Sequence, residues 1–239
     1  MTPALLQRAK DIAGPRMTTR VRCLLRGHGL PRWGKLRRTT PLSSTFGFER
    51  GTPIDRRYLR QFLHAHRALI TGDVLEVQTS SYTRRYGRDL RRTDTFDINP
   101  VFHPTYLCDL AHSENTLPTS AFDCVLLPQT LQHLRELDAC LAHLLRVVRP
   151  GGVILASAAG LMPLTADVPD YWRLSPDGWR ERLSRAWSGA EVTVEGHGNC
   201  LTAIASQLGL ALEELTDAKL DARDPRYPAL TAILCRKPR

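Results

Sequence analysis

The sequence predicts an α/β protein in which helices cover both faces of a mainly parallel β-sheet. Short apolar runs of strand length recur between residues 74 and 235, and segments with helical periodicity separate them. The runs are continuous rather than alternating, which is typical of strands buried on both faces. The chain has 239 residues, 42% of them hydrophobic and 24% charged, so it can build a large core with an ordinary globular composition.

Basic charge is concentrated in the N-terminal part of the chain. Residues 1–60 contain 14 Lys and Arg against 3 Asp and Glu, whereas the remainder contains 19 against 21. We expect residues 1–45 to form one or two short helices and a basic loop, and residues 46–239 to form the main domain. A second basic cluster comprises Arg84, Arg85, Arg88, Arg91 and Arg92. Such clusters hold an anionic small molecule or nucleic acid, or are only solvated. Without an aromatic-rich RNA-binding signature or zinc-finger spacing, nucleic acid is the least favoured of the three.

The first helix of the main domain is expected to begin at Thr52-Pro53-Ile54-Asp55. Threonine can cap a helix, proline suits the first helical position, and an early acid favours the helix dipole. Apolar residues at near-helical spacing continue the pattern, and Thr71-Gly72 should end it.

Strands and helices then alternate. Strands are expected at residues 74–78, 94–98, 105–108, 122–128, 152–158, 191–196 and 229–235. The apolar face of an amphipathic helix runs from Leu131 to Val148, and the helix should stop at Arg149-Pro150-Gly151-Gly152. Further helices are expected at about 176–187 and 199–209.

Several protein classes are excluded at this stage. No stretch of about 18 apolar residues exists, so a membrane span is not expected. The first residues lack the apolar core of a secretory signal, and six scattered cysteines form no C-x-x-C pair. We therefore expect a cytoplasmic protein with reduced thiols and without a metal site.

Three stretches carry a family resemblance. They are "VLEV", whose acid is Glu76; "SAFDCVLLPQTLQHL", a strand that leads into a helix; and "LLRVVRPGGVILAS", a helix, Pro-Gly-Gly and a strand. In this order and at this spacing they resemble class I S-adenosylmethionine-dependent methyltransferases. Flanking stretches such as "SYTRRYG" and "DYWRLSP" resemble a bacterial group of small methyltransferase-like proteins often encoded beside glycosyltransferases.

The resemblance covers roughly residues 36–236 and implies a Rossmann-like sheet of seven strands with the last strand antiparallel. It places S-adenosylmethionine above the carboxyl ends of the first strands, where open α/β sheets bind ligands. The implied cofactor-binding residues are Glu76, Gln78, Thr79, Tyr82, Asp97, Asn99, Asp109, Leu110, Gln129 and Thr130.

Two of these positions depart from the family pattern. Gln78 stands where such proteins usually have glycine, and its Cβ is expected to hinder a close backbone approach to the cofactor. Asn99 is expected at the position of the ribose-binding acid, with Asp97 two residues earlier. An amide offers one acceptor oxygen and no charge assistance, so we expect cofactor binding to be weakened.

The resemblance also suggests catalytic and substrate residues. His133, one helical turn after the fourth strand, is the candidate general base, with an exposed helix histidine as the alternative. Candidate substrate residues are Asp55, Tyr58, Arg84, Arg85, Tyr171, Trp172, Arg173, His197 and Asn199. For some of these a structural role is the alternative: Asp55 and Asn199 can cap helices, and the aromatic residues can belong to a packed lid.

The expected function is methyl transfer from S-adenosylmethionine to a small polar substrate of sugar, nucleotide or natural-product type, with anionic substrates included. No nucleic-acid partner is expected. One alternative keeps the fold for non-methylating chemistry such as cyclisation, elimination or hydrolysis. Another is a non-catalytic partner that docks through the basic N-terminal segment. The sequence leaves open whether the chain forms a homodimer.

Overall fold

The computed structural model describes residue 34 and residues 37–165 and 167–239. The chain divides into two compact units, Met1–Thr40 and Pro41–Arg239. Most of the expected basic segment, and Cys23 with it, lies outside the described residues. Residues 41–45 are bends and loops that begin the second unit, where the backbone N–H of Leu42 donates to the carbonyl of Leu208 at 2.8 Å.

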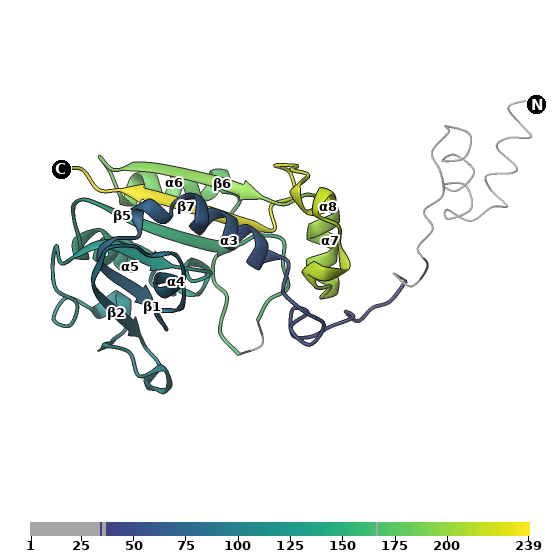
Figure 1. The fold of residues 1–239 in the computed structure, drawn as a ribbon, viewed down its shortest axis with the longest axis horizontal. Helices are drawn as coiled ribbons and strands as arrows, with labels where there is room; N and C mark the ends of the chain where they lie inside the picture. Colours follow the sequence, from purple (N-terminus) through teal and green to yellow (C-terminus); the bar gives the residue numbers. More distant parts are fainter. Residues whose placement is uncertain (1–33, 35–36, 166) are drawn as a thin grey trace, which may run out of the picture. The chain divides into compact units, whose positions relative to one another are not determined.

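A seven-stranded sheet forms the centre of the second unit, with strand order β3-β2-β1-β4-β5-β7-β6 (Figure 1). The strands are β1 Gly72–Val77, β2 Leu90–Asp97, β3 Tyr106–Leu107, β4 Phe122–Leu127, β5 Val148–Ala159, β6 Glu191–His197 and β7 Leu230–Arg236. β7 pairs antiparallel with both β5 and β6, and the other pairs are parallel. The predicted sheet, including its antiparallel last strand, is confirmed.

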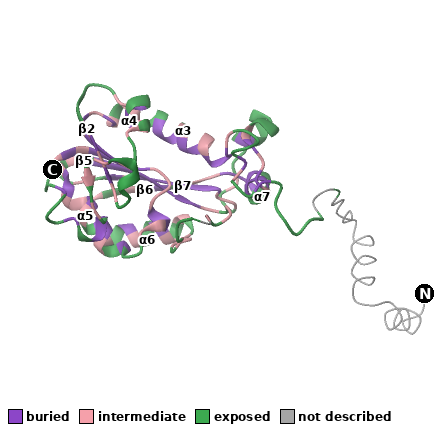
Figure 2. Ribbon diagram, turned by 90° about the horizontal axis from the view of Figure 1, so that it is seen from below, coloured by how far each residue is buried: buried purple, intermediate pink, exposed green. Residues whose placement is uncertain are grey.

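Each face of the sheet is covered by its own helices (Figure 2). On one face lie α3 Asp55–Ala65, α4 Ser81–Tyr86, α7 Cys200–Leu208 and α8 Asp217–Asp221; on the other lie α5 Leu137–Val147 and α6 Pro176–Ala186. Neighbouring strand residues alternate between the two cores: Val74 packs with α3, whereas Leu75 packs with α5. Trp179 and Trp187 are fully buried against α5, and each such side chain contributes roughly 1.5–3 kcal/mol or more to folding.

The start of α3 differs from the expectation that Thr52 caps it. The helix begins at Asp55, and its N-cap residue Ile54 has no side-chain capping bond. The backbone of Thr52 is used elsewhere: its carbonyl accepts from Leu212 N at 2.7 Å, and its N–H donates to the Glu213 carboxylate at 2.9 Å. Thr52 therefore joins a neighbouring segment and leaves the helix uncapped. The helix also ends earlier than expected, at Ala65, and a 3₁₀ turn, η2 Arg67–Leu69, follows.

The helix after β4 is shorter than its apolar pattern predicts. Residues Leu131–His133 form a 3₁₀ turn, α5 begins only at Leu137, and it ends at Val147. Pro150 and Gly151 do not end the helix, because α5 has already stopped at Val147 and both residues lie inside the first part of β5. The pairing of β4 with β5 shifts register there, and such an irregularity accommodates a proline that cannot donate to the sheet.

The two C-terminal helices agree with their sequence signals. Ser175 caps α6 by accepting from Gly178 N, with Pro176 in the first turn. Asn199 and Thr202 form a reciprocal capping box at the start of α7, and Gly209 ends that helix in the left-handed region at φ +71°.

A network of ion pairs joins the amino ends of the central strands. Arg149 at the start of β5 donates to Asp73 of β1 and to Asp123 of β4, both at 2.7 Å. Arg91 of β2 also reaches Asp123 and Asp73. The Arg149 hydrogen bond holds the pKa of Asp73 below its usual value. This network therefore links four strands at the edge opposite their carboxyl ends.

In the part of the chain that the structure describes, no helix is both long and apolar enough to cross a membrane.

Candidate functional site

A cavity of about 1010 Å³ opens at the carboxyl ends of β1, β2 and β4. We call it the strand-end cavity. Its lining includes all ten residues that the sequence assigns to the cofactor: Glu76, Gln78, Thr79, Tyr82, Asp97, Asn99, Asp109, Leu110, Gln129 and Thr130. His133 and Tyr171 line it as well. Residues spread over 96 positions of the sequence are therefore brought to one side of the sheet.

The turn after β1 keeps a glycine-like backbone although it contains no glycine. Gln78 lies in the left-handed region at φ +67°, and its N–H donates to the Phe96 carbonyl at 2.9 Å. Glu76 is buried, and its carboxylate accepts from the backbone N–H groups of Tyr82 at 3.0 Å and Thr83 at 2.8 Å. Burial raises the pKa of Glu76, and these hydrogen bonds oppose that rise. Glu76 thus fixes the short helix α4, which the sequence pattern did not predict, directly behind the turn.

The end of β2 separates the two candidates for the ribose position, Asp97 and Asn99. The strand ends at Asp97, so a carboxylate and not an amide stands at its carboxyl end. Asn99 caps the following 3₁₀ turn, η3 Pro100–Phe102, and its Oδ1 accepts from Val101 N at 3.0 Å. Asp97 Oδ1 accepts from Asn99 N at 2.7 Å. Asp97 therefore ends the strand, whereas Asn99, which also lines the cavity, caps the turn that follows.

Asp109 lies after β3 and provides a second carboxylate to the cavity. Its Oδ1 accepts from Ala111 N at 2.9 Å and caps the turn η4 Leu110–His112. Cys108 lies beside it in the lining. Burial raises the pKa of the Cys108 thiol, and the carboxylates of Asp109 and Asp97 raise it further. Both effects disfavour the thiolate, which is the nucleophilic form of cysteine.

Gln129, two residues after the end of β4, repeats the left-handed backbone conformation found after β1. Gln129 has φ +51°, and its backbone N–H donates to Ser157 Oγ at 2.8 Å. Its Nε2 donates to the buried carboxylate of Asp55 at 2.8 Å, which orients the amide. Its Oε1 is buried and has no hydrogen-bond partner among the described residues. A buried acceptor without a donor is costly, and at a cavity it is a candidate ligand contact.

Hydrogen bonds fix the tautomer of His133. Its Nδ1 lies 2.9 Å from the Pro169 carbonyl, which can only accept, so Nδ1 carries the proton. Its Nε2 lies 3.0 Å from Gln132 Nε2, which donates, so the Nε2 lone pair is engaged. The Gln132 amide is oriented by Gln129 O at 2.8 Å and Ala159 N at 3.2 Å. His133 can accept a further proton only after this contact with Gln132 is released.

Two substrate candidates instead hold the loop after β5. Trp172 packs on the core, and its Nε1 donates to the Leu134 carbonyl at 2.7 Å. Arg173 pairs with the buried carboxylate of Asp170 and donates to the carbonyls of Gly160, Met162 and Pro163. Neither residue lines the strand-end cavity, whereas Tyr171, which is 45% exposed, does.

Three further substrate candidates lie away from the cavity, near α7 and α8. The Tyr58 hydroxyl donates to the Leu220 carbonyl at 2.9 Å. The Tyr58 ring stacks with the His197 ring, with 6.2 Å between the ring centroids. Asn199 caps α7 and donates to the carbonyls of Lys219 and Ala222. Burial lowers the pKa of His197. These side chains connect secondary-structure elements, and none of the three lines the strand-end cavity.

The remaining substrate candidates are Asp55 and two arginines of α4. Asp55 does not line the cavity and reaches it through Gln129. Arg84 and Arg85 are exposed and lie outside its lining.

Among the residues that sequence reasoning did not single out are Arg56, Arg60 and Gln132. Arg56 and Arg60 lie one turn apart on α3 and both line the cavity. Arg56 Nη1 donates to the Tyr82 hydroxyl at 3.2 Å. Their spacing of four residues was a readable signal of a shared helix face. Gln132 carried no comparable signal, because its role depends on tertiary hydrogen bonds.

The strand-end cavity fits a bound nucleoside with an amino-acid tail. Asp97 and Asp109 each keep one carboxylate oxygen that accepts no hydrogen bond from the described residues. The orphan Oε1 of Gln129 suits an ammonium or hydroxyl donor. A metal is a poorer match, since residues 34, 37–165 and 167–239 hold no group of three or more His, Cys, Asp or Glu side chains that could bind one.

Known protein families agree with this geometry. Residues 58–156 match the family model described as "Methyltransferase domain". The match runs from α3 into β5 and so includes β1 to β4, whose ends form the strand-end cavity. No curated protein matches the sequence significantly.

Solved structures of related fold have low sequence identity. A SAM dependent methyltransferase from Archaeoglobus fulgidus has a TM-score of 0.53 and 15% identity, over 82% of this chain and 100% of that one. A putative S-adenosylmethionine dependent methyltransferase from Listeria monocytogenes has a TM-score of 0.52 and 10% identity, over 78% and 97%. A Haemonchus contortus phosphoethanolamine N-methyltransferase 2 in complex with S-adenosyl-L-methionine has a TM-score of 0.50 and 15% identity, over 75% and 53%. At these identities the likeness shows the fold.

Proposed function

We propose that this chain is a class I S-adenosylmethionine-dependent methyltransferase and that it transfers a methyl group to a small polar acceptor. The observation that carries the proposal is the strand-end cavity. Ten residues assigned to the cofactor from sequence alone line this one cavity. It lies at the carboxyl ends of parallel strands, the usual ligand position in open α/β sheets.

The polar groups of the cavity suggest how the chain holds S-adenosylmethionine. Asp97, at the end of β2, would accept from the ribose hydroxyls, and Asp109 would face the adenine side. The left-handed turn at Gln78 brings backbone rather than side chain toward the ligand. Gln129 would accept from the amino group of the methionine tail through its orphan Oε1.

When bound, S-adenosylmethionine supplies a methyl group on a sulfonium, which is transferred by in-line attack. The chain's part is mainly positioning, because alignment and contact of the reacting atoms can contribute several kcal/mol, up to about 7–11. The Trp172 and Arg173 contacts hold the loop after β5 beside the cavity, so that Tyr171 can cover the acceptor.

We propose His133 as the residue that accepts the acceptor's proton, at Nε2. Its Nδ1–H bond to the Pro169 carbonyl holds the ring, and release of the Gln132 contact frees Nε2. Replacement by glutamine should lower kcat by about 10²- to 10⁴-fold at neutral pH while cofactor affinity stays the same. An unchanged kcat and pH profile would leave His133 as a residue that only ties Pro169 to the cavity.

Cofactor binding is the experiment that separates methylation from a non-catalytic docking role. Calorimetric titration of the full chain with S-adenosylmethionine and S-adenosylhomocysteine should give one site with a Kd in the micromolar range. Absence of heat at millimolar ligand would contradict the proposal. Tight binding together with conversion of an acceptor that gains no methyl group would instead favour non-methylating chemistry on this fold.

Asp97 and Asn99 provide a matched pair for the ribose contact. Asp97→Asn removes the charge at the strand end and should weaken S-adenosylhomocysteine binding by tenfold or more, about 1.4 kcal/mol. Asn99→Asp keeps the cap of η3 and should change affinity by less than about threefold. The reverse order of effects would return the ribose contact to position 99.

A further inference from the structure

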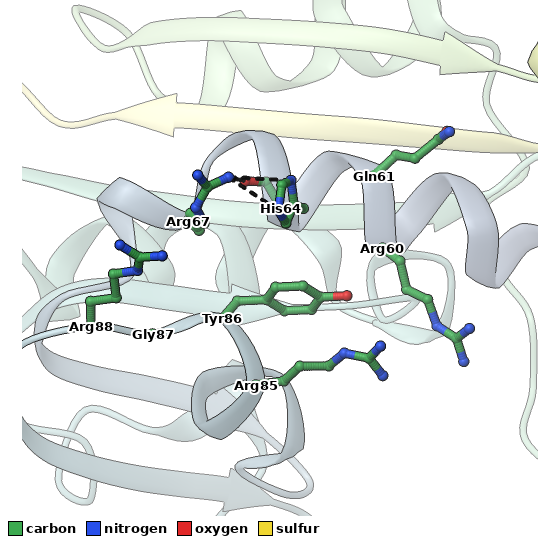
Figure 3. Close-up of a pocket in the computed structure, with 8 residues that line it drawn as sticks. All are labelled: Arg60, Gln61, His64, Arg67, Arg85, Tyr86, Gly87 and Arg88. Carbon is green, nitrogen blue, oxygen red and sulfur yellow. Dashed lines mark hydrogen bonds between the residues drawn. The ribbon is translucent and has the colours of Figure 1, made fainter.

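A second cavity, of about 590 Å³, lies between α3 and α4. We call it the arginine groove. Its lining comprises Arg60, Gln61, His64, Arg67, Arg85, Tyr86, Gly87 and Arg88, which come from α3, η2, α4 and the two residues after α4 (Figure 3). Four of the eight residues are arginines and none is acidic. Arg60 also lines the strand-end cavity, so the two cavities adjoin at that side chain.

The four arginines of the groove form no ion pair with any described residue, which distinguishes them from neighbours on the same helix. Arg57, one turn before Arg60 on α3, pairs with both Asp217 and Asp221 at 2.8 Å. Arg67 donates only to the His64 carbonyl, at 3.1 Å, and to the His64 ring. Cations held together without carboxylates repel one another, so a bound anion would relieve this repulsion.

Tyr86 divides the groove. The residue is buried, and Figure 3 shows its hydroxyl pointing to the side where Arg60 and Arg85 reach, while Arg67 and Arg88 lie to the other side of the ring. The Arg85 guanidinium carbon is 5.5 Å from the centroid of this ring. The Tyr86 hydroxyl has no hydrogen-bond partner among the described residues and can donate to a ligand oxygen.

We propose that the arginine groove binds the diphosphate group of a small-molecule ligand, at a site separate from the strand-end cavity. Guanidinium groups match phosphate oxygens through paired hydrogen bonds, and two groups on each side of Tyr86 suit two linked phosphates. The volume lies in the range of small-molecule sites and exceeds that of a diphosphate alone, which favours an organic diphosphate. The arginines gather in one hollow, whereas a nucleic-acid backbone would need them along a path.

The test is calorimetric titration of the full chain with inorganic pyrophosphate and with uridine diphosphate, at low and moderate salt. Both titrations are repeated on protein saturated with S-adenosylhomocysteine. We expect one binding site for each ligand. The double variant Arg85→Gln/Arg88→Gln should bind both ligands at least tenfold more weakly. The control Arg180→Gln/Arg185→Gln changes the same charge on α6, on the other face of the sheet, and should stay within twofold.

Each outcome bears on the proposal. Arg85→Lys/Arg88→Lys should bind with intermediate strength, and thermal unfolding confirms that all variants fold. If uridine diphosphate binds more tightly than pyrophosphate, the groove recognises an organic diphosphate. If the two affinities are equal, the groove recognises only the diphosphate group. Absence of pyrophosphate binding, equal binding by the double variant, or displacement by S-adenosylhomocysteine would each overturn the site. Binding of single-stranded RNA without pyrophosphate would assign the groove to nucleic acid and also overturn it. Loss of S-adenosylhomocysteine binding with pyrophosphate binding intact would refute only the proposed methyl transfer.

Discussion

Two glutamines occupy the backbone conformation that usually belongs to glycine, Gln78 after β1 and Gln129 after β4. A side chain in the left-handed region costs about 1–2 kcal/mol, and such strain is often retained at functional sites. β1 and β4 are neighbours in the sheet, so both strained residues meet at the strand-end cavity. The turn thus forms with Gln78 in place of glycine, at a local cost in stability.

Replacement of Gln78 measures this cost. Gln78→Gly should raise the free energy of unfolding by about 0.5–1 kcal/mol and leave cofactor affinity equal or tighter, since glycine adopts φ +67° without strain. Gln78→Val should lower it, because a β-branched residue is worst tolerated there. Urea unfolding of both variants checks the order. A glycine variant that binds more weakly would make the Gln78 side chain a direct cofactor contact.

The pair Asp97 and Asn99 shows what sequence reasoning does not resolve at the scale of single residues. The sequence located an acceptor at residues 97–99 but not which side chain stood at the strand end. Strand ends are set by pairing with neighbours, and β2 ends where Asp97 pairs with Leu107 of β3. A two-residue strand such as β3 has little periodicity of its own, so the end of β2, which depends on pairing with β3, could not be predicted from the sequence.

At the scale of elements, segments with a long apolar pattern were predictable, and a short helix that depends on a tertiary contact was not. The strands and the helices α6 and α7 follow from periodicity and capping residues. The six-residue helix α4 is too short for a periodic signal and depends on the buried Glu76 carboxylate, a contact made by tertiary structure. Leu131 is buried as predicted, yet it belongs to a 3₁₀ turn, because burial does not require an α-helix.

The ion pairs at the amino ends of the strands should give stability a specific pH dependence. The pKa of Asp73 is lowered in the folded state, chiefly by Arg149. The pair therefore stabilises the fold above the unfolded-state pKa of about 3.9, and this contribution is lost as pH falls through the folded-state pKa. Asp73→Asn should lower the free energy of unfolding by up to about 1 kcal/mol at pH 7, because the pair is partly solvated.

Urea unfolding at about pH 7 and about pH 3.5 checks this dependence. The difference between Asp73→Asn and the parent should shrink at the lower pH. Asp89→Asn is the control: Asp89 is exposed, forms no ion pair among the described residues, and has a left-handed backbone that asparagine tolerates. Its change should stay within about 0.5 kcal/mol. If Asp73→Asn and Asp89→Asn change the free energy of unfolding equally, the ion pairs of Asp73 do not stabilise the fold.

At the scale of the whole molecule, the second compact unit contains every residue of both cavities. The strand-end cavity draws on residues from Phe48 onward, and the unit begins at Pro41. A shortened chain of residues 41–239 should therefore fold and bind S-adenosylhomocysteine within about twofold of the full chain. Calorimetry and thermal unfolding provide the measurement. A large loss of affinity would show that the basic segment contributes to the cofactor site.

The position of β7 has a consequence for how the protein is made. β7 is the last strand in the sequence, yet it lies between β5 and β6 and pairs with both. During translation β6 leaves the ribosome with no strand to join, and the edge of β5 stays open until residues 230–236 emerge. The sheet therefore remains incomplete until β7 has been synthesised. A chain stopped at Pro228 should lose cooperative unfolding and aggregate, whereas release of the last seven strand residues completes the sheet in one step.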